Sequence, residues 1–256
     1  MSRTFLGQNF LVDTQVQQRI CDAFRPEGFF GEIGPGRGAI TSHLEKRYEE
    51  FWVFEKDPKM ADLYRNKTNI HLVEGDFVDW DFQLAGKPVE NFSLIGNLPY
   101  ESGTKMVLRV VEHMPKIKHF VFMLQKEVVD RLCAKPRTSD FGSLSVLVQT
   151  FYELESLFLV PPSAFRPAPK VDSKVVRALR RADAPAVDRA FLKFVHSCFL
   201  HKRKMLKNSL RSRFAPERVA ESLRKLGLSD TVRAEEIPVD LWPRFFGDLA
   251  DEQAAR

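Results

Sequence analysis

Four consecutive residues, Asn97-Leu98-Pro99-Tyr100, bring together an amide, a rigid turn and an aromatic ring. Such a set suits methyl transfer to a planar amino nitrogen, whose lone pair is delocalised until the nitrogen becomes more tetrahedral. The side-chain oxygen of Asn97 and the carbonyl of Leu98 can each accept one N–H, which stabilises the positive charge forming on nitrogen. Pro99 fixes the turn, and Tyr100 can stack on the base. The alternative is an Asn-Pro turn that only ends a strand.

A glycine-rich turn precedes this tetrad at residues 29–38, which read Phe-Phe-Gly-Glu-Ile-Gly-Pro-Gly-Arg-Gly. An apolar run of strand type leads into the glycines, and residues 39–46 are expected to be helical. Gly34 and Gly36 have no Cβ, so a ligand can lie directly against the backbone. With Ala39 they also fit the dinucleotide fingerprint, and a tight turn without a ligand remains possible.

Two acidic residues follow at the expected ends of later strands. Glu55 lies ~20 residues beyond the glycine turn, where a carboxylate accepts both hydroxyls of a ribose. Asp76 can accept the exocyclic amino group of an adenine, although either acid could instead cap a helix or lie on the surface. A dinucleotide and S-adenosylmethionine both contain adenosine. Because no His or Tyr–Lys pair for hydride transfer is evident at these strand ends, S-adenosylmethionine is preferred.

The elements that must position these residues alternate along the chain. Strands are expected at residues 51–55, 70–74, 92–95 and 120–124, and helices at residues 58–67, 104–112 and 126–132. This alternation predicts an α/β fold, a Rossmann-like sheet with helices on both faces. Because ligands bind beyond the carboxyl ends of such strands, the glycine turn, Glu55, Asp76 and Asn97 should share one crevice.

Other elements flank this core. A helix is expected from about Gln15 to Pro26, with a capping box formed by Thr14 and Gln17. Residues 143–151 are expected to be helical, and residues 152–160 and 173–179 to form the last strands around a proline-rich loop at 161–170.

The composition sets bounds on the class of protein. The chain has 256 residues, of which 44% are hydrophobic and 29% charged, enough for a large domain and a small one. No apolar run reaches the ~20 residues of a membrane helix, and residues 1–10 show no export signal. Cys21, Cys133 and Cys198 form no Cys-x-x-Cys pair, which suits the cytoplasm and argues against disulfides or zinc. We therefore expect a soluble, cytoplasmic protein without a metal.

The positive charge is concentrated in one segment. Residues 177–213 hold eleven Lys or Arg against two acidic residues, whereas the rest of the chain holds 28 basic and 32 acidic residues. This distribution is typical of a polyanion binder, although a solvated helical face is the alternative. We expect phosphate contacts from Lys202, Arg203, Lys204 and Arg211. We place a catalytic domain at residues 1–181 and a helical RNA-binding domain at residues 182–256.

Seven motifs are spread along the chain: Gly7–Leu11, Glu32–Gly36, Glu74–Asp76, Asn97–Tyr100, Gln125–Val128, Val160–Phe165 and Pro169–Ser173. Together they resemble the ribosomal RNA adenine dimethyltransferase family over nearly the whole chain. The stretch His201–Lys204 with Asn208–Leu210 is similar to the branch that modifies the small ribosomal subunit, the KsgA or RsmA type.

The resemblance implies a class I S-adenosylmethionine-dependent methyltransferase sheet with a small C-terminal helical domain. It implies catalysis by residues 97–100 and cofactor contacts from Asn9, Leu11, Gly34, Gly36, Glu55, Asp76 and Asn97. Phe165 and Lys170, both in the proline-rich loop, are candidates for RNA contact, with a packing role for Phe165 as the alternative.

By the same resemblance, the enzyme would dimethylate N6 of two adjacent adenosines in the 3′-terminal hairpin loop of small-subunit (16S) rRNA. Each target base would be flipped into the pocket, at lower cost because loop bases are partly unstacked. The expected partner is this rRNA within a ribosomal particle, a 30S precursor, and the protein is expected to be a monomer.

The chain departs from the family pattern after the tetrad, where Glu101-Ser102-Gly103-Thr104-Lys105 replaces the usual Asn and Ser-x-Pro. Three other functions stay open: a large-subunit adenine methyltransferase of the macrolide-resistance kind, a NAD-dependent dehydrogenase, and a non-catalytic RNA-binding or transcription-accessory protein. The stretch Lys202–Leu210 speaks against the first.

Overall fold

The computed structural model describes residues 9–250 except 85–86, 187 and 202–203. Contacts between Cα atoms divide the chain into two compact units. Unit 1 comprises residues 1–129 and 153–180, and unit 2 comprises residues 130–152 and 181–256. The chain therefore passes between the two units more than once.

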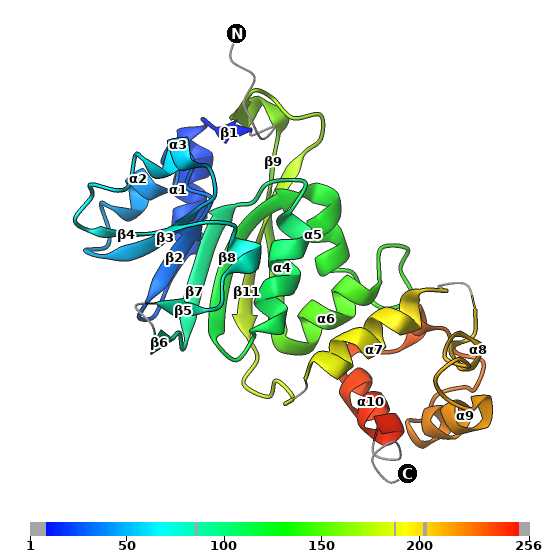
Figure 1. Ribbon diagram of the computed structural model, residues 1–256. Coiled ribbons are helices and arrows are strands. Elements are labelled where there is room, and N and C mark those ends of the chain that lie inside the picture. Colours follow the sequence, from blue (N-terminus) through cyan, green and yellow to red (C-terminus); the bar gives the residue numbers. More distant parts are fainter. Residues whose placement is uncertain (1–8, 85–86, 187, 202–203, 251–256) are drawn as a thin grey trace. The chain divides into compact units, whose positions relative to one another are not determined.

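A seven-stranded sheet forms the centre of unit 1 (Figure 1), in the order β4-β3-β2-β7-β8-β11-β9. Its strands are β2 (Phe30–Ile33), β3 (Phe51–Glu55), β4 (Ile70–Glu74), β7 (Phe92–Asn97), β8 (Ile117–Gln125), β9 (Tyr152–Val160) and β11 (Ser173–Arg180). The strands from β4 to β8 are parallel, and β11 runs antiparallel to β8. The predicted α/β sheet is confirmed.

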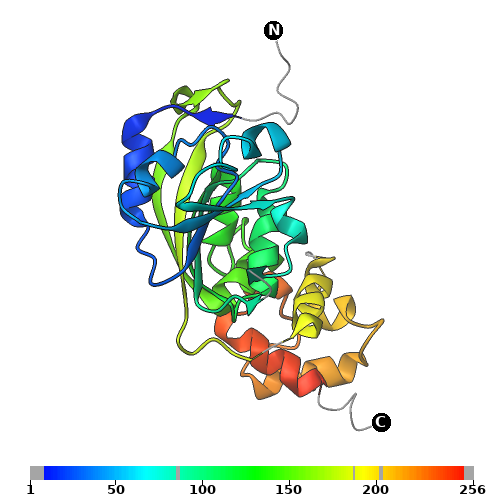
Figure 2. The ribbon, with the colours of Figure 1, turned by 60° about the vertical axis from the view of Figure 1, so that its left-hand side comes forward.

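Helices cover both faces of this sheet (Figures 1 and 2). On one face, α1 (Thr14–Ala23) inserts Val16 and Ile20 into a core that includes Val121 of β8, and the C-cap residue Phe24 packs in the same core. Each such side chain contributes about 1.5–3 kcal/mol through burial. The helices α2 (Thr41–Leu44) and α3 (Pro58–Ala61) follow the first two strands, and α4 (Gly103–Glu112) follows β7.

The predicted capping box of α1 is wrong. Asp13, rather than Thr14, is the N-cap residue, and its carboxylate accepts the backbone N–H groups of Gln15 and Val16 at 2.9 and 3.1 Å. The Gln17 side chain donates instead to the carbonyl of Leu11 at 3.1 Å. A carboxylate at a helix N-terminus also interacts favourably with the helix dipole, which explains why Asp13 takes this position.

A pair of short strands joins two distant parts of unit 1. The strand β1 (Phe10–Leu11) pairs antiparallel with β10 (Phe165–Arg166), and the Val12 N–H donates to the carbonyl of Ala164 at 2.8 Å. The two strands lie more than 150 residues apart in sequence, so no local pattern indicates this pairing. A smaller pair consists of β5 (Gln83–Leu84) and β6 (Lys87–Pro88), and short 3-10 turns lie at Phe77–Asp79 and Pro162–Ala164.

Unit 2 is helical. It contains α6 (Ser143–Phe151), α7 (Arg189–Phe199), α8 (Leu206–Ser209), α9 (Pro216–Lys225) and α10 (Trp242–Ala250), with 3-10 turns at Ala234–Glu236 and Val239–Leu241. The helix α5 (Lys126–Leu132) leads into it. Buried aromatic side chains of α7 and α10, chiefly Phe194, Trp242 and Phe245, form its core. Contacts thus group residues 130–152 with the C-terminal helices, while the functional division at residue 181 stays a prediction.

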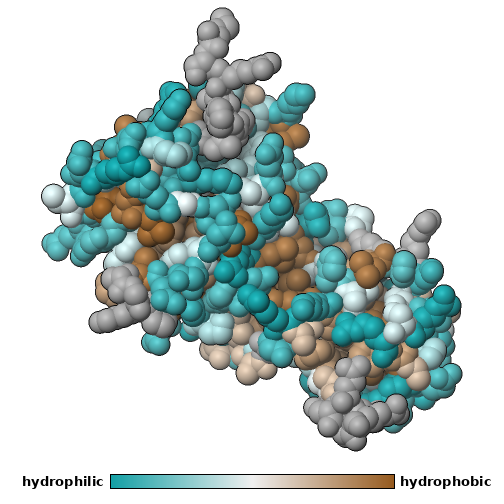
Figure 3. Space-filling view, viewed as in Figure 1, coloured by the Kyte–Doolittle hydropathy of each residue, from teal (hydrophilic) through white to brown (hydrophobic). Residues whose placement is uncertain are grey.

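The surface seen in Figure 3 is mostly hydrophilic, with apolar residues in separate patches. Over the described part of the chain, no helix combines the length and the apolar character that crossing a bilayer requires.

Candidate active site

A cavity of about 1230 Å³ lies at the carboxyl ends of β2, β3 and β7 in unit 1. Every described residue that the sequence assigned to catalysis or to the cofactor lines it: Asn9, Leu11, Gly34, Gly36, Glu55, Asp76, Asn97, Leu98, Pro99 and Tyr100. Phe165 and Lys170 line it too. The expectation that the strand ends share one crevice is confirmed, and the role of each residue remains a prediction.

The sheet register brings the tetrad beside the glycine loop. Ile33 of β2 is paired with Gly96 of β7, so the residues that follow each strand, Gly34 and Asn97, emerge next to each other. A Cβ at Gly96 would lie 2.7 Å from the Ile33 carbonyl oxygen, closer than real Cβ contacts occur. Gly96 therefore allows β7 to approach β2 closely enough to place Asn97 at the cavity.

The glycine loop adopts a backbone that side chains disfavour, with φ of 65° at Gly34 and 53° at Gly36. The Gly34 N–H donates to the Phe54 carbonyl at 2.9 Å. The Gly36 N–H donates to Oε2 of Glu55 at 3.0 Å. The loop is thus anchored to the end of β3, the strand that supplies the predicted ribose ligand.

Glu55 is almost completely buried and uses both carboxylate oxygens. Oε2 accepts the Gly36 N–H, and Oε1 accepts the Asp57 N–H at 2.9 Å. Burial raises the pKa of Glu55, and these backbone N–H groups oppose that rise. Each oxygen retains a second lone pair, so the carboxylate can still accept the two hydroxyls of a ribose.

Asp76 follows β4 and is engaged on both oxygens. Oδ1 accepts the Val78 N–H at 3.1 Å, and Oδ2 pairs with Nζ of Lys56 at 2.6 Å. Burial alone would raise the pKa of Asp76, but Lys56 and the Val78 N–H outweigh it and leave this pKa below its usual value. An adenine amino group would therefore compete with the Lys56 ammonium group for Oδ2 of Asp76.

The tetrad is held from three sides. The Asn97 amide Nδ2 donates to the carbonyl of Asn9 at 3.5 Å, which leaves Oδ1, the acceptor atom, for a ligand. The Leu98 N–H donates to the Met123 carbonyl at 3.0 Å, and its side chain is buried. The Tyr100 hydroxyl lies 2.6 Å from Oγ of Ser173 on β11. These contacts fix the backbone and the ring that the predicted chemistry needs.

The residues predicted to contact RNA lie in different surroundings. Phe165 is fully buried and is paired with Leu11 across β1 and β10, so packing in the core accounts for this side chain. Lys170 lies at the cavity. Lys204 and Arg211 are exposed in unit 2, whereas Lys202 and Arg203 lie outside the described residues.

Several residues of the site were not singled out from the sequence. Arg37 of the glycine loop stacks its guanidinium over the Phe10 ring, 4.4 Å from the centroid, and both line the cavity. Lys56 and Ser173 act on Asp76 and Tyr100 through the contacts above. Lys56 could have been singled out because it is next to Glu55 in the sequence. The contacts of Phe10 and Ser173 depend on tertiary structure and could not.

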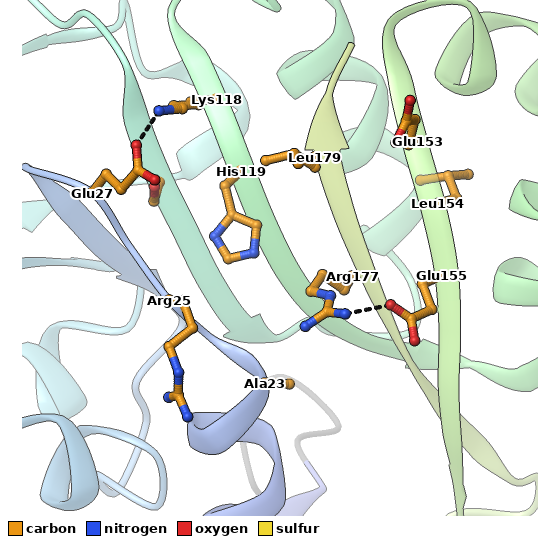
Figure 4. Close-up of a pocket in the computed structure, with 11 residues that line it drawn as sticks. Ala23, Arg25, Glu27, Lys118, His119, Glu153, Leu154, Glu155, Arg177 and Leu179 are labelled. Atoms are coloured by element: carbon orange, nitrogen blue, oxygen red, sulfur yellow. Dashed lines mark hydrogen bonds and ion pairs between the residues drawn. The ribbon is translucent and has the colours of Figure 1, made fainter. Parts of the chain in front are cut away.

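A second cavity, of about 410 Å³, lies in unit 1 where β7, β8 and β9 begin (Figure 4). Its walls carry two ion pairs, Arg177 with Glu155 and Lys118 with Glu27. Burial, followed by the positive charge of Arg177, lowers the pKa of His119 to about 4. No residue predicted to bind or react lines this cavity, so the candidate active site is the larger one.

Comparison with known proteins places the chain among rRNA methyltransferases. The family model described as "Ribosomal RNA adenine dimethylase" matches residues 1–251. A protein of Nitrosospira multiformis named "Ribosomal RNA small subunit methyltransferase A" is 38% identical over 245 residues, covering 93% of this chain and 92% of that protein. A protein of Leptothrix cholodnii with the same name is 40% identical over 245 residues, covering 93% and 88%.

Two solved structures resemble the chain over nearly its full length. The dimethyladenosine transferase of Plasmodium falciparum has a TM-score of 0.80 at 20% identity, covering 95% of this chain and 98% of that one. The 23S rRNA methyltransferase ErmE has a TM-score of 0.68 at 29% identity, covering 94% and 100%. The class I methyltransferase fold predicted from the sequence is confirmed.

Proposed function

The chain belongs to the ribosomal RNA adenine dimethylase family, and from this membership we propose that it is an S-adenosylmethionine-dependent methyltransferase that dimethylates N6 of adenosines in small-subunit (16S) rRNA. The observation that carries the proposal is that the glycine loop, Glu55, Asp76 and Asn97 all line the same cavity, the larger of the two described above. Its volume exceeds the 300–1,000 Å³ typical of small-ligand pockets, which leaves space for a target base beside a cofactor.

The residues of the cavity fit S-adenosylmethionine. The carboxylate of Glu55 has free lone pairs for a ribose, and Asp76 provides an acceptor at the neighbouring strand end. The glycine loop lets a ligand lie close to the backbone. When bound, the cofactor supplies an electrophilic methyl group on its sulfonium.

The tetrad acts on the target amine. Before the first transfer, Oδ1 of Asn97 and the Leu98 carbonyl accept the two N–H groups of N6, and before the second transfer one of them accepts the N–H that remains, which favours the tetrahedral geometry that makes the nitrogen nucleophilic. After each transfer the methylated nitrogen loses one proton, which passes to solvent. Tyr100 stacks on the base, with its ring held through Ser173. No strongly shifted general base is required, because most of the rate comes from holding the methyl group and N6 in line.

The relatives named for the small subunit support small-subunit rRNA as the substrate. We propose that the targets are two adjacent adenosines of the 3′-terminal hairpin loop of 16S rRNA, presented in a 30S precursor particle. The protein would act as a monomer in the cytoplasm. Lys170 and the exposed cations Lys204 and Arg211 would contact the RNA backbone.

Mass spectrometry of rRNA from cells with and without this protein tests the proposal. We expect N6,N6-dimethyladenosine at two adjacent positions of 16S rRNA only when the protein is present. Purified protein with methyl-labelled S-adenosylmethionine should label the same positions in 30S particles from the deficient cells. Labelling of 23S rRNA would support the large-subunit alternative instead, and binding of RNA without labelling would support a non-catalytic role.

A further inference from the structure

We propose that Tyr64 is a positioning residue for the cofactor, and that its hydroxyl sets the shape of the glycine loop through the carbonyl of Gly36. The inference rests on the proposed function, because it concerns the same cofactor site. Tyr64 lies in the turns that follow α3 and was not among the residues predicted from the sequence.

The contact is direct and buried. The Tyr64 hydroxyl donates to the carbonyl oxygen of Gly36 at 3.0 Å, and the side chain is 3% exposed. Its ring belongs to the same core cluster as Val16 and Ile20 of α1. Burial raises the pKa of Tyr64, so the phenol keeps its donor proton at neutral pH.

Gly36 is thereby held on both sides of its Cα. Its N–H belongs to the preceding peptide plane and donates to Glu55, whereas its carbonyl belongs to the following plane and accepts from Tyr64. Peptide units are planar, so these two bonds fix the φ and ψ of Gly36 between them. A glycine is otherwise the residue most free to change those angles.

The same arrangement links Tyr64 to the predicted ribose ligand. Glu55 shares its Oε2 with Gly36, so a shift of this glycine would move or release one oxygen of the carboxylate. The phenol also lies close to the loop at a second point, since a Cβ at Gly38 would lie 3.4 Å from the Tyr64 hydroxyl oxygen, at van der Waals contact. On the cavity side, a Cβ at Gly36 would likewise lie 3.4 Å from the Phe10 ring.

The variant Tyr64→Phe removes one oxygen atom and retains the ring in the core. Losing a buried hydrogen bond to a backbone carbonyl should raise the KM for S-adenosylmethionine roughly five- to thirty-fold. The kcat at saturating cofactor and the affinity for 30S particles should change less than about two-fold, since Tyr64 touches neither the tetrad nor the RNA. Methyl transfer and isothermal titration with S-adenosylhomocysteine measure these quantities.

The matched control is Tyr48→Phe, which also removes a phenol oxygen near the same core, where the Tyr48 ring packs on Phe30. We expect its KM to equal that of the unmodified protein. An unchanged KM in Tyr64→Phe, or a rise shared by Tyr48→Phe, would overturn the inference. An unfolded Tyr64→Phe protein would also overturn it, because the hydroxyl would then serve the whole fold. If the unmodified protein transferred no methyl group, the proposed function itself would fail.

Discussion

The Tyr100 hydroxyl and Oγ of Ser173 lie 2.6 Å apart and tie the end of the tetrad to β11. Ser173 is fully buried, and burial raises the pKa of Tyr100 while this hydrogen bond opposes the rise. The ring that is proposed to stack on the target base is therefore held by its outer atom. Ser173, which holds the Tyr100 ring, lies 73 residues after it in the sequence.

Ser173→Ala should lower kcat roughly three- to ten-fold, because the loss of one hydrogen bond of about 1 kcal/mol frees the Tyr100 ring. Cofactor affinity should not change. Ser93→Ala is the matched control, since Ser93 is a fully buried serine of the same sheet whose Oγ has no partner among the described residues. Steady-state methylation assays decide between the two outcomes, and equal rates for both variants would contradict the role of Ser173.

Asn97→Ala should leave much of the S-adenosylmethionine affinity but reduce methyl transfer by about two to three orders of magnitude, as expected when a transition-state acceptor is removed. Calorimetry gives the affinity, and single-turnover kinetics give the rate. Unchanged turnover would remove Asn97 from the mechanism.

Lys56→Met should tighten cofactor binding by roughly two- to five-fold, because the solvent-exposed ion pair with Asp76 is weak and its removal leaves Oδ2 of Asp76 free to accept from the cofactor. The amino group of adenine would then reach Oδ2 without competition. Lys59→Met, a neighbouring exposed lysine, is the control. Weaker binding in Lys56→Met would show instead that the lysine stem supports the adenine.

Glu32→Gln should flatten the dependence of Tm on pH. Glu32 is buried and accepts from Thr41 at 2.7 Å, and burial raises its pKa to about 8. An acid whose pKa is higher in the folded state costs stability as pH rises from about 4.5 to 8, because the unfolded chain ionises first. Thermal unfolding between pH 5 and 9, in roughly unit steps, should show the unmodified protein losing more stability than the variant. If Tm fell equally with pH in the unmodified protein and in Glu32→Gln, the loss of stability would come from groups other than Glu32.

Replacing Lys204 and Arg211 by Ala should weaken RNA binding and reduce the slope of log affinity against log salt by about one unit for each phosphate that is no longer neutralised. Both side chains are exposed in unit 2. Lys225→Ala is the control, since this lysine pairs with Glu221 and Asp248. A slope that stays the same would mean that this basic side does not face RNA.

Local patterns predicted the central elements well. The bounds of β3 (Phe51–Glu55) and β4 (Ile70–Glu74) agree with the sequence expectation, because short apolar runs between turn residues define such strands. The rule for strand ends then located the cavity. Neither step needs information from distant parts of the chain.

Other features depend on tertiary contacts and could not be predicted. The helix expected at residues 58–67 ends at Ala61, after which the chain continues in tighter turns and Tyr64 reaches Gly36. The pairing of β1 with β10 joins two-residue strands that lie far apart in sequence. Lys56 stands next to Glu55 in the sequence, yet only the structure shows that it neutralises Asp76.

The strand order β8-β11-β9 has a consequence for translation. Because β11 lies between two strands that are synthesised before it, β9 leaves the ribosome with no neighbour to join. A nascent chain that stops short of Ser173 presents β8 as an open edge, with unpaired backbone groups that invite aggregation. Truncated products of this gene should therefore be insoluble rather than weakly active.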